Sequence, residues 1–111
     1  MILGNVRARR GLAARIPERL DELCGPALGV VVLPMHLTWH GLREFDVADT
    51  DWRLRLYTIV LSQGKRTDIA RFVHAGLLCH DWPQLSSLVS PAVRDTCARR
   101  FGLARQASPG S

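Results

Sequence analysis

Two histidines in one short segment are the first residues whose spacing could do chemistry. His36 and His40 lie four positions apart, and on a helix this spacing would place both imidazoles on one face, as a zinc site requires. Pro34 and the β-branched residues before it instead predict an extended or looped segment. No glutamate follows His36 directly, and the chain contains no C-x-x-C pair. We therefore predict no metal site here, and histidines that form hydrogen bonds beside an aromatic patch.

Four closely spaced carboxylates offer a second chemistry. On a strand, Glu44 and Asp46 would share one face, as magnesium-dependent phosphoryl chemistry requires of paired carboxylates. Asp49 and Asp51 fit the first turn of a helix better, because carboxylates there accept hydrogen bonds from free backbone N–H groups. The spacing therefore favours a solvated loop leading into a helix cap over a bound cation.

The motifs of common enzyme classes are absent from the sequence. Serine, histidine and aspartate all occur, but there is no G-x-S-x-G elbow, no Walker A loop and no G-x-G-x-x-G turn. We predict a non-enzymatic protein with no catalytic residue and no cofactor.

Charge is strongly segregated along this basic chain, whose net charge is +5. Residues 1–20 carry five arginines against one glutamate, which gives +4, whereas residues 21–52 carry one arginine against six acids, which gives −5. Residues 53–111 carry nine bases against three acids, which gives +6. Such a chain could pair its charges internally or present a charged face to a partner.

Nucleic-acid binding is the alternative function that this charge suggests. Residues 65–73 with the turn at Gly76 resemble the first half of a helix-turn-helix, but the following segment is apolar and contains Pro83, so it lacks a recognition helix. A transcriptional regulator could still bind phosphates without sequence preference through the Arg-rich ends of the chain. The arginines in question are Arg7, Arg9, Arg10, Arg99 and Arg100.

Tryptophans supply the main aromatic mass and predict a protein-interaction surface. Trp39, Trp52 and Trp82 are the three in the chain, and His40 adjoins the first of them. Tryptophan is enriched in interface hot spots, although core and rim positions are its commoner place in a small domain. These four residues are our candidates for contact with a partner protein.

Breaker residues and β-branched runs divide the first half of the chain. Residues 17–23 open with proline and predict a short helix, and residues 29–34 predict a strand. Residues 35–39 are expected to continue it as a second extended piece. Phe45 and Val47, which alternate with polar neighbours, predict a further short strand.

Capping signals divide the second half into helices. Asp49 or Thr50 can cap a helix whose apolar stripe includes Trp52, and Gly64 is expected to end it in a left-handed conformation. Thr67 can cap the next helix, and a further one is expected over residues 76–81, stopping before the proline at 83. Ser90 with the following proline opens the last helix, and glycine at 102 ends it. The fold class we predict is mainly α, with three to four short helices and a small β element, and α+β as the alternative.

The length of 111 residues fits one domain. We assign residues 1–16 to an Arg-rich arm, residues 17–103 to a single globular domain and residues 104–111 to a disordered tail. The chain has no apolar run long enough to span a membrane, and three cysteines without a close pair predict free, buried thiols, so we expect a cytoplasmic protein.

Three stretches of the chain form a pattern that is shared with other proteins. They are Pro17-Glu18-Arg19-Leu20-Asp21-Glu22-Leu23 with Gly25-Pro26; Leu33-Pro34, His36-Leu37 and Trp39-His40-Gly41; and Arg55-Leu56-Tyr57, Val60-Leu61, Asp68, Phe72, Leu77-Leu78 and Trp82-Pro83. The pattern resembles a group of small uncharacterised proteins of high-GC Gram-positive bacteria, and the resemblance spans roughly residues 17–102. Proteins of this group can be encoded beside nucleotidyltransferase-like toxins, which implies an antitoxin-like or accessory role. It assigns no functional residue.

Overall fold

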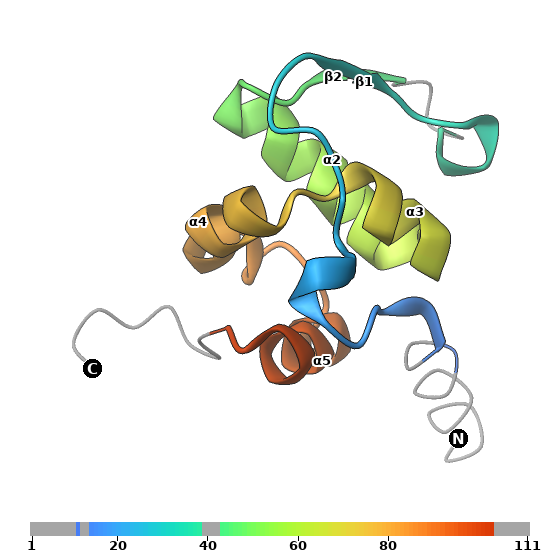
Figure 1. Ribbon diagram of the computed structural model, residues 1–111. Helices are drawn as coiled ribbons and strands as arrows, with labels where there is room; N and C mark the ends of the chain where they lie inside the picture. Colours follow the sequence, from blue (N-terminus) through green and yellow to red (C-terminus); the bar gives the residue numbers. More distant parts are fainter. Residues whose placement is uncertain (1–10, 12–13, 39–42, 104–111) are drawn as a thin grey trace.

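Helices dominate the part of the chain that the structure describes, which is residues 11, 14–38 and 43–103. In this computed structural model a β hairpin lies at one end, against the longest helix, and the last helix lies at the opposite end (Figure 1). The mainly α fold with a small β element is thereby confirmed. The elements are 3₁₀ helix η1 (Leu20–Glu22), β1 (Val30–Val32), 3₁₀ helix η2 (Met35–Leu37), β2 (Glu44–Asp46), α2 (Thr50–Gln63), α3 (Arg66–Phe72), α4 (Ala75–Leu85) and α5 (Pro91–Phe101).

The hairpin pairs β1 and β2 antiparallel, with Val31 opposite Phe45. Both of these side chains are buried, and their neighbours along each strand point outward. Both predicted strands are confirmed. The extended piece expected after β1 is wrong over Met35–Leu37, which forms one 3₁₀ turn because the carbonyl of Pro34 accepts a hydrogen bond from the N–H of Leu37 at 3.0 Å.

Of the two caps predicted for α2, Asp49 or Thr50, the structure has Asp49. The Asp49 carboxylate accepts hydrogen bonds from the N–H groups of Asp51 and Trp52, at 2.9 and 3.3 Å. The expected left-handed end at Gly64 is wrong, because this residue has φ −74°. Glycine is needed there for space instead: a Cβ would lie 2.6 Å from the carbonyl oxygen of Val60.

Two boundaries in the middle of the chain differ from the prediction. The N-cap of α3 is Lys65, not Thr67, because the Asp68 carboxylate reaches back to accept the Lys65 N–H at 2.9 Å. Helix α4 continues through Pro83 rather than stopping before it. Since Pro83 lies near the C-terminal end of α4, the missing N–H removes a hydrogen bond only near that end.

The last helix follows its sequence signals closely. Ser90 accepts a hydrogen bond from the N–H of Val93 at 3.3 Å, Pro91 occupies the first turn, and Gly102 ends the helix with φ +68°. The predicted start and end of α5 are both confirmed.

Residues 17–29, which lead into β1, are mostly non-helical. Only Leu20–Glu22 of the helix predicted over residues 17–23 forms, as a single 3₁₀ turn. The chain then runs beside the end of α3, where the N–H groups of Cys24 and Gly25 bond to the carbonyls of Ala70 and Val73 at 2.7 and 2.9 Å. These contacts fix the direction in which the chain enters the hairpin.

The buried part of the fold reaches back into the segment assigned to the arm. Ile16 is fully buried, and the Arg15 guanidinium donates to the carbonyls of Leu61 and Gly64 at 3.1 and 2.7 Å. A cation therefore neutralises the negative C-terminal end of α2. Residues 1–10, 12 and 13 of the predicted arm lie outside the described residues, and so does the whole predicted tail.

Candidate interaction surface

One face of the hairpin places apolar and acidic side chains side by side. Val30 and Val32 of β1 are 62% and 53% exposed, although valines are usually buried. The register sets Val30 opposite Asp46 and Val32 opposite Glu44, and both carboxylates are exposed. We call these four residues the outer hairpin face. Its side chains point away from the core because Val31 and Phe45 occupy the buried side of the same strands.

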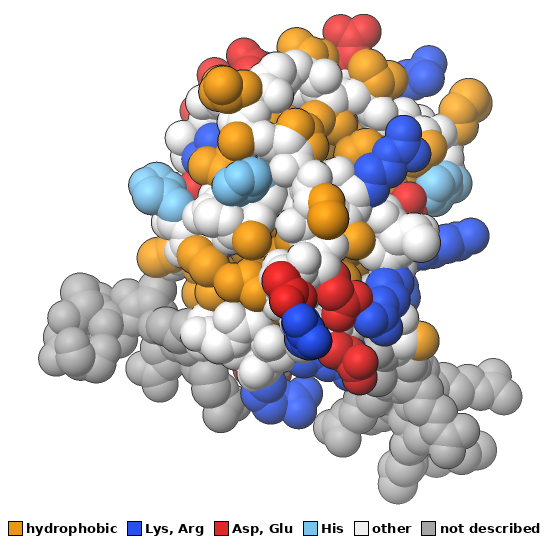
Figure 2. Space-filling model, viewed as in Figure 1, with side chains coloured by type: hydrophobic (Ala, Val, Ile, Leu, Met, Phe, Trp, Pro, Cys, Tyr) orange, Lys and Arg blue, Asp and Glu red, His pale blue; other side chains and the backbone are white. Residues whose placement is uncertain are grey.

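Further exposed apolar residues lie before and after β1 in the chain. Leu28 precedes the strand and Met35 follows it, and each is 76% exposed. Hydrophobic and acidic side chains accordingly lie together at the hairpin end of the molecule (Figure 2). A cluster of exposed apolar residues with a polar rim is typical of a protein-binding site, whereas single exposed apolar residues are common on any surface.

The four acids of this region are outside the ion pairs that the described residues form. Within the described residues, none of Glu44, Asp46, Asp49 and Asp51 forms an ion pair. The two that accept hydrogen bonds, Asp46 and Asp49, take them from nearby backbone N–H groups. Among the described residues, the hairpin end therefore carries carboxylates that no ion pair neutralises, on a chain whose net charge is positive.

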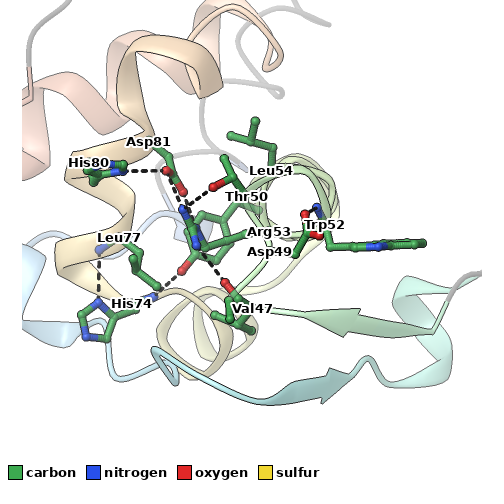
Figure 3. A network of polar contacts seen from close by, with 12 residues as sticks. Val47, Asp49, Thr50, Trp52, Arg53, Leu54, His74, Leu77, His80 and Asp81 are labelled. Atoms are coloured by element: carbon green, nitrogen blue, oxygen red, sulfur yellow. Dashed lines mark hydrogen bonds and ion pairs between the residues drawn. The ribbon is translucent and has the colours of Figure 1, made fainter.

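The tryptophans divide between surface and core. Trp52 is 37% exposed, its ring lies edge-on to Phe45 with centroids 5.9 Å apart, and the Arg55 guanidinium lies 5.6 Å from its centroid. Its side chain points away from the polar contacts on the other side of α2 (Figure 3). Trp82 is only 3% exposed and packs in the core, so its side chain is not on a surface that a partner could reach. The other two candidates, Trp39 and His40, lie outside the described residues.

A buried ion pair holds the hairpin to the helices. Arg53 of α2 and Asp81 of α4 are 5% and 2% exposed, and two bonds of 2.5 and 2.9 Å join the guanidinium to the carboxylate. The same guanidinium donates to the carbonyl of Val47, directly after β2, at 2.8 Å. These contacts converge on Arg53 from three elements (Figure 3). Arg53 thereby fixes the hairpin relative to α2 and α4.

The carboxyl group of Asp81 is held in its ionised form. Burial by itself raises the pKa of Asp81, but the hydrogen bonds from Arg53 and His80 outweigh burial, and the pKa is lowered. The His80 Nδ1 lies 3.0 Å from the Asp81 carboxylate, and the side chain of His80 is 75% exposed. A carboxylate behind an exposed imidazole orients that ring, but no nucleophile among the described residues makes a hydrogen bond to it. We therefore assign this network a positioning role.

The histidine considered for metal binding also has a structural partner. The Nε2 atom of His36 lies 2.8 Å from the Asp68 carboxylate, which caps α3. Burial by itself raises the pKa of Asp68. The hydrogen bonds from His36 and from the Lys65 N–H outweigh burial, so the pKa of Asp68 is lowered overall. The pair links η2 to α3, close to the end of β1. No three His, Cys, Asp or Glu residues of the described chain are grouped so that they could hold a metal ion.

The arginines proposed to bind nucleic acid either lie outside the described residues or form hydrogen bonds within the protein. Arg7, Arg9 and Arg10 lie outside it. Arg100 donates to the carbonyl of Ile16 and so fastens α5 to the N-terminal segment. Arg99 is exposed, and its Nε donates to the carbonyl of Asp95 on the same helix at 3.4 Å. Of these five arginines, the structure therefore describes only Arg99 and Arg100.

The valines of the outer hairpin face and the Arg53 network were missed among the site candidates. Glu44 and Asp46 were considered only as a cation site, and the solvated loop preferred there is wrong, since both lie on one face of β2. For Val30 and Val32 the available signal was the two-residue period of strands, since three valines in a row cannot all be buried in a hairpin with one face on the core. For Arg53 the signal was its place four residues before Tyr57, which continues the buried stripe of α2.

Comparisons with known protein families, with curated proteins and with solved structures found no match. Among the described helices, none is long and apolar enough to pass through a lipid bilayer. The function must therefore be argued from the surface itself.

Proposed function

We propose that this protein is a non-enzymatic interaction module that binds another protein through the outer hairpin face. The observation that carries the proposal is the exposure of Val30 and Val32 beside two carboxylates that no cation of the described chain neutralises. Burial of apolar surface is the main driving force of protein association, and a charged rim provides orientation and selectivity.

The construction of the hairpin supports this role. The outer hairpin face leaves apolar area exposed to water in the isolated protein. The Arg53 network holds the hairpin rigidly on the helices. A rigid surface loses little conformational entropy when a partner binds. The features of the hairpin thus fit a docking platform better than a lid over a reaction centre.

The resemblance to the small bacterial proteins suggests which biological role the module has. It supports an antitoxin-like or regulatory role in the cytoplasm, in which the module binds a partner protein and changes that partner's activity. The alternative, a transcriptional regulator acting through its Arg-rich ends, has less support, because Arg100 already bonds to the main chain of Ile16.

Site-specific photo-crosslinking in the native host tests the proposal. A photoreactive amino acid placed at Leu28 should cross-link one protein, whereas the same group at Leu88, another exposed leucine (52%), should not. The Val30→Thr change in the Leu28 background should reduce the cross-linked product, because it makes the contact polar while keeping the side-chain shape. Equal yields from positions 28 and 88 would reject the proposal, and so would nucleic acid that co-purifies in place of a protein and is removed by salt.

A further inference from the structure

In the part of the chain that the structure describes, the outer edge of β1 has backbone groups available to a further strand. Hydrogen bonds join the carbonyl of Gly29 to the N–H of Val47 at 2.9 Å, and the N–H of Leu33 to the carbonyl of Arg43 at 2.8 Å. Because antiparallel bonding alternates along a strand, Val31 faces β2 and the N–H and C=O groups of Val30 and Val32 face the opposite edge. Among the described residues, nothing hydrogen-bonds to these four groups.

Within β1, which is three residues long, this edge carries no charged side chain, proline or bulge. Natural proteins protect an open edge with charged side chains, prolines or bulges, but β1 is three valines in regular register with β2. The sheet has two strands in the order β1-β2, and α2 packs against β2, so the open edge lies on the side of the hairpin away from that contact. A two-stranded sheet is stabilised when a third strand joins it.

We propose that β1 accepts an extended segment of the partner protein as a third strand, and that this segment alternates apolar residues with arginine or lysine. The inference rests on the proposed function and specifies how the partner binds. Backbone hydrogen bonds to Val30 and Val32 provide the pairing, as in other cases of strand addition.

Charge determines which side chains the segment carries. On the outer face, the stems of arginine or lysine from a third strand would lie over the exposed valines, and their charged ends would point toward Glu44 and Asp46 on the far strand. A second copy of this chain is a poorer occupant. If two copies paired through β1, the second copy would add its own Glu44 and Asp46 to the outer face of the joined sheet. Its outer hairpin face has no basic side chain to pair with the carboxylates of the first copy.

Binding of a short labelled peptide of alternating arginine and valine tests the pairing. The Val32→Pro variant removes an N–H that faces the open edge and leaves the β1–β2 hydrogen bonds in place, so the hairpin should fold while the third strand is blocked. We expect its affinity to fall at least about tenfold, from the lost hydrogen bond and the ring at the edge. The matched control Val32→Thr keeps the N–H and the branched shape, and its affinity should change by no more than about threefold. Circular dichroism verifies that both variants are folded.

Hydrogen exchange gives a readout that does not depend on variants. On peptide binding, the amides of Val30 and Val32 should exchange at least about tenfold more slowly, whereas that of Val31, already in the ladder, should change little. The Glu44→Gln and Asp46→Asn changes together should weaken binding and flatten its dependence on salt. A peptide alternating glutamate with valine should bind more weakly than the arginine peptide.

Each other outcome overturns a stated part of the inference. Unchanged affinity of Val32→Pro, or unprotected amides at positions 30 and 32, overturns strand addition. Equal binding of the glutamate peptide, or a dimer in sedimentation that Val32→Pro dissociates, overturns the basic partner segment. If cross-linking from Leu28 still yields its protein, the proposed function survives either failure, whereas loss of that cross-link rejects the proposed function as well.

Discussion

Removing the buried guanidinium of Arg53 should destabilise the protein severely. The Arg53→Met change keeps an unbranched apolar stem but removes the guanidinium, and so leaves the Asp81 carboxylate, 2% exposed, without its main partner. It also leaves the carbonyl of Val47 without its donor. Among the described bonds to Asp81, only that from His80 remains.

The size of the effect follows from the burial of the pair. Loss of one partner of a buried ion pair costs about 3–5 kcal/mol, because the remaining charge is desolvated and uncompensated. A domain of this size has a free energy of unfolding of about 5–15 kcal/mol. We therefore expect a large part of the stability to be lost, while the double change Arg53→Met with Asp81→Leu should recover much of it, since no charge is then buried.

Unfolding in urea, followed by circular dichroism at two pH values, measures the effect and its cause. In the native protein the pKa of Asp81 is lowered, so the ionised carboxylate stabilises the fold above its unfolded pKa of about 3.9, and this stability is lost as the pH falls through the folded value. In Arg53→Met, burial acts without the Arg53 bonds and should raise the pKa of Asp81 above that of the unfolded chain. That contribution should then be present at low pH and be lost as the pH rises.

The variant should therefore lie closest to the native protein in mildly acidic solution and farthest from it at neutral pH. A loss below about 1 kcal/mol at neutral pH, as for an exposed ion pair, would refute the reasoning. A double variant no more stable than Arg53→Met would refute it too, because the cost would then come from lost packing rather than from an unpaired charge.

Three further predictions concern packing, reactivity and capping. Gly25→Ala should lower the free energy of unfolding by about 1–3 kcal/mol, because a Cβ would lie 2.4 Å from the carbonyl carbon of Phe72; unchanged thermal stability would contradict this contact. Burial raises the pKa of the Cys97 thiol to about 12, so a thiol reagent at neutral pH should modify the two exposed cysteines at once and Cys97 only on unfolding, and three equally fast thiols would be inconsistent with that burial. Ser90→Ala should cost about 1 kcal/mol by removing the cap of α5, whereas Ser90→Asp should retain most of the stability in the same melting experiment.

Local signals predicted the elements whose ends are determined by their own residues. The cap at Asp49, the start of α5 at Ser90 and its glycine end need only neighbours a few positions away, and each was predicted correctly. Lys65 replaced Thr67 as a cap because the carboxylate of Asp68 selects the helix start. Propensity alone does not distinguish two adjacent starts.

Contacts between segments that are distant in the sequence determine the features that were not predicted. Arg53 and Asp81 are 28 residues apart, and neither position alone indicates its partner. The expectation that all three thiols are buried was wrong for Cys24 and Cys79, which are exposed, because a cysteine at the edge of a core gives the same sequence pattern as one inside it. The exposure of Trp52 and the burial of Trp82 likewise depend on which helices pack together.

The acids of the negatively charged segment have two different environments in the fold. Among the acids of the negative segment, Glu22 pairs with Arg66 of the positive half at 2.6 Å, so part of the charge is compensated internally. The hairpin acids Glu44 and Asp46 form no ion pair within the described residues, although the chain as a whole has a surplus of arginine. If internal pairing were the only use of this charge, those acids would be expected to lie near arginines as Glu22 does. Their placement beside exposed valines instead favours a surface that is completed by positive charge from outside the described fold.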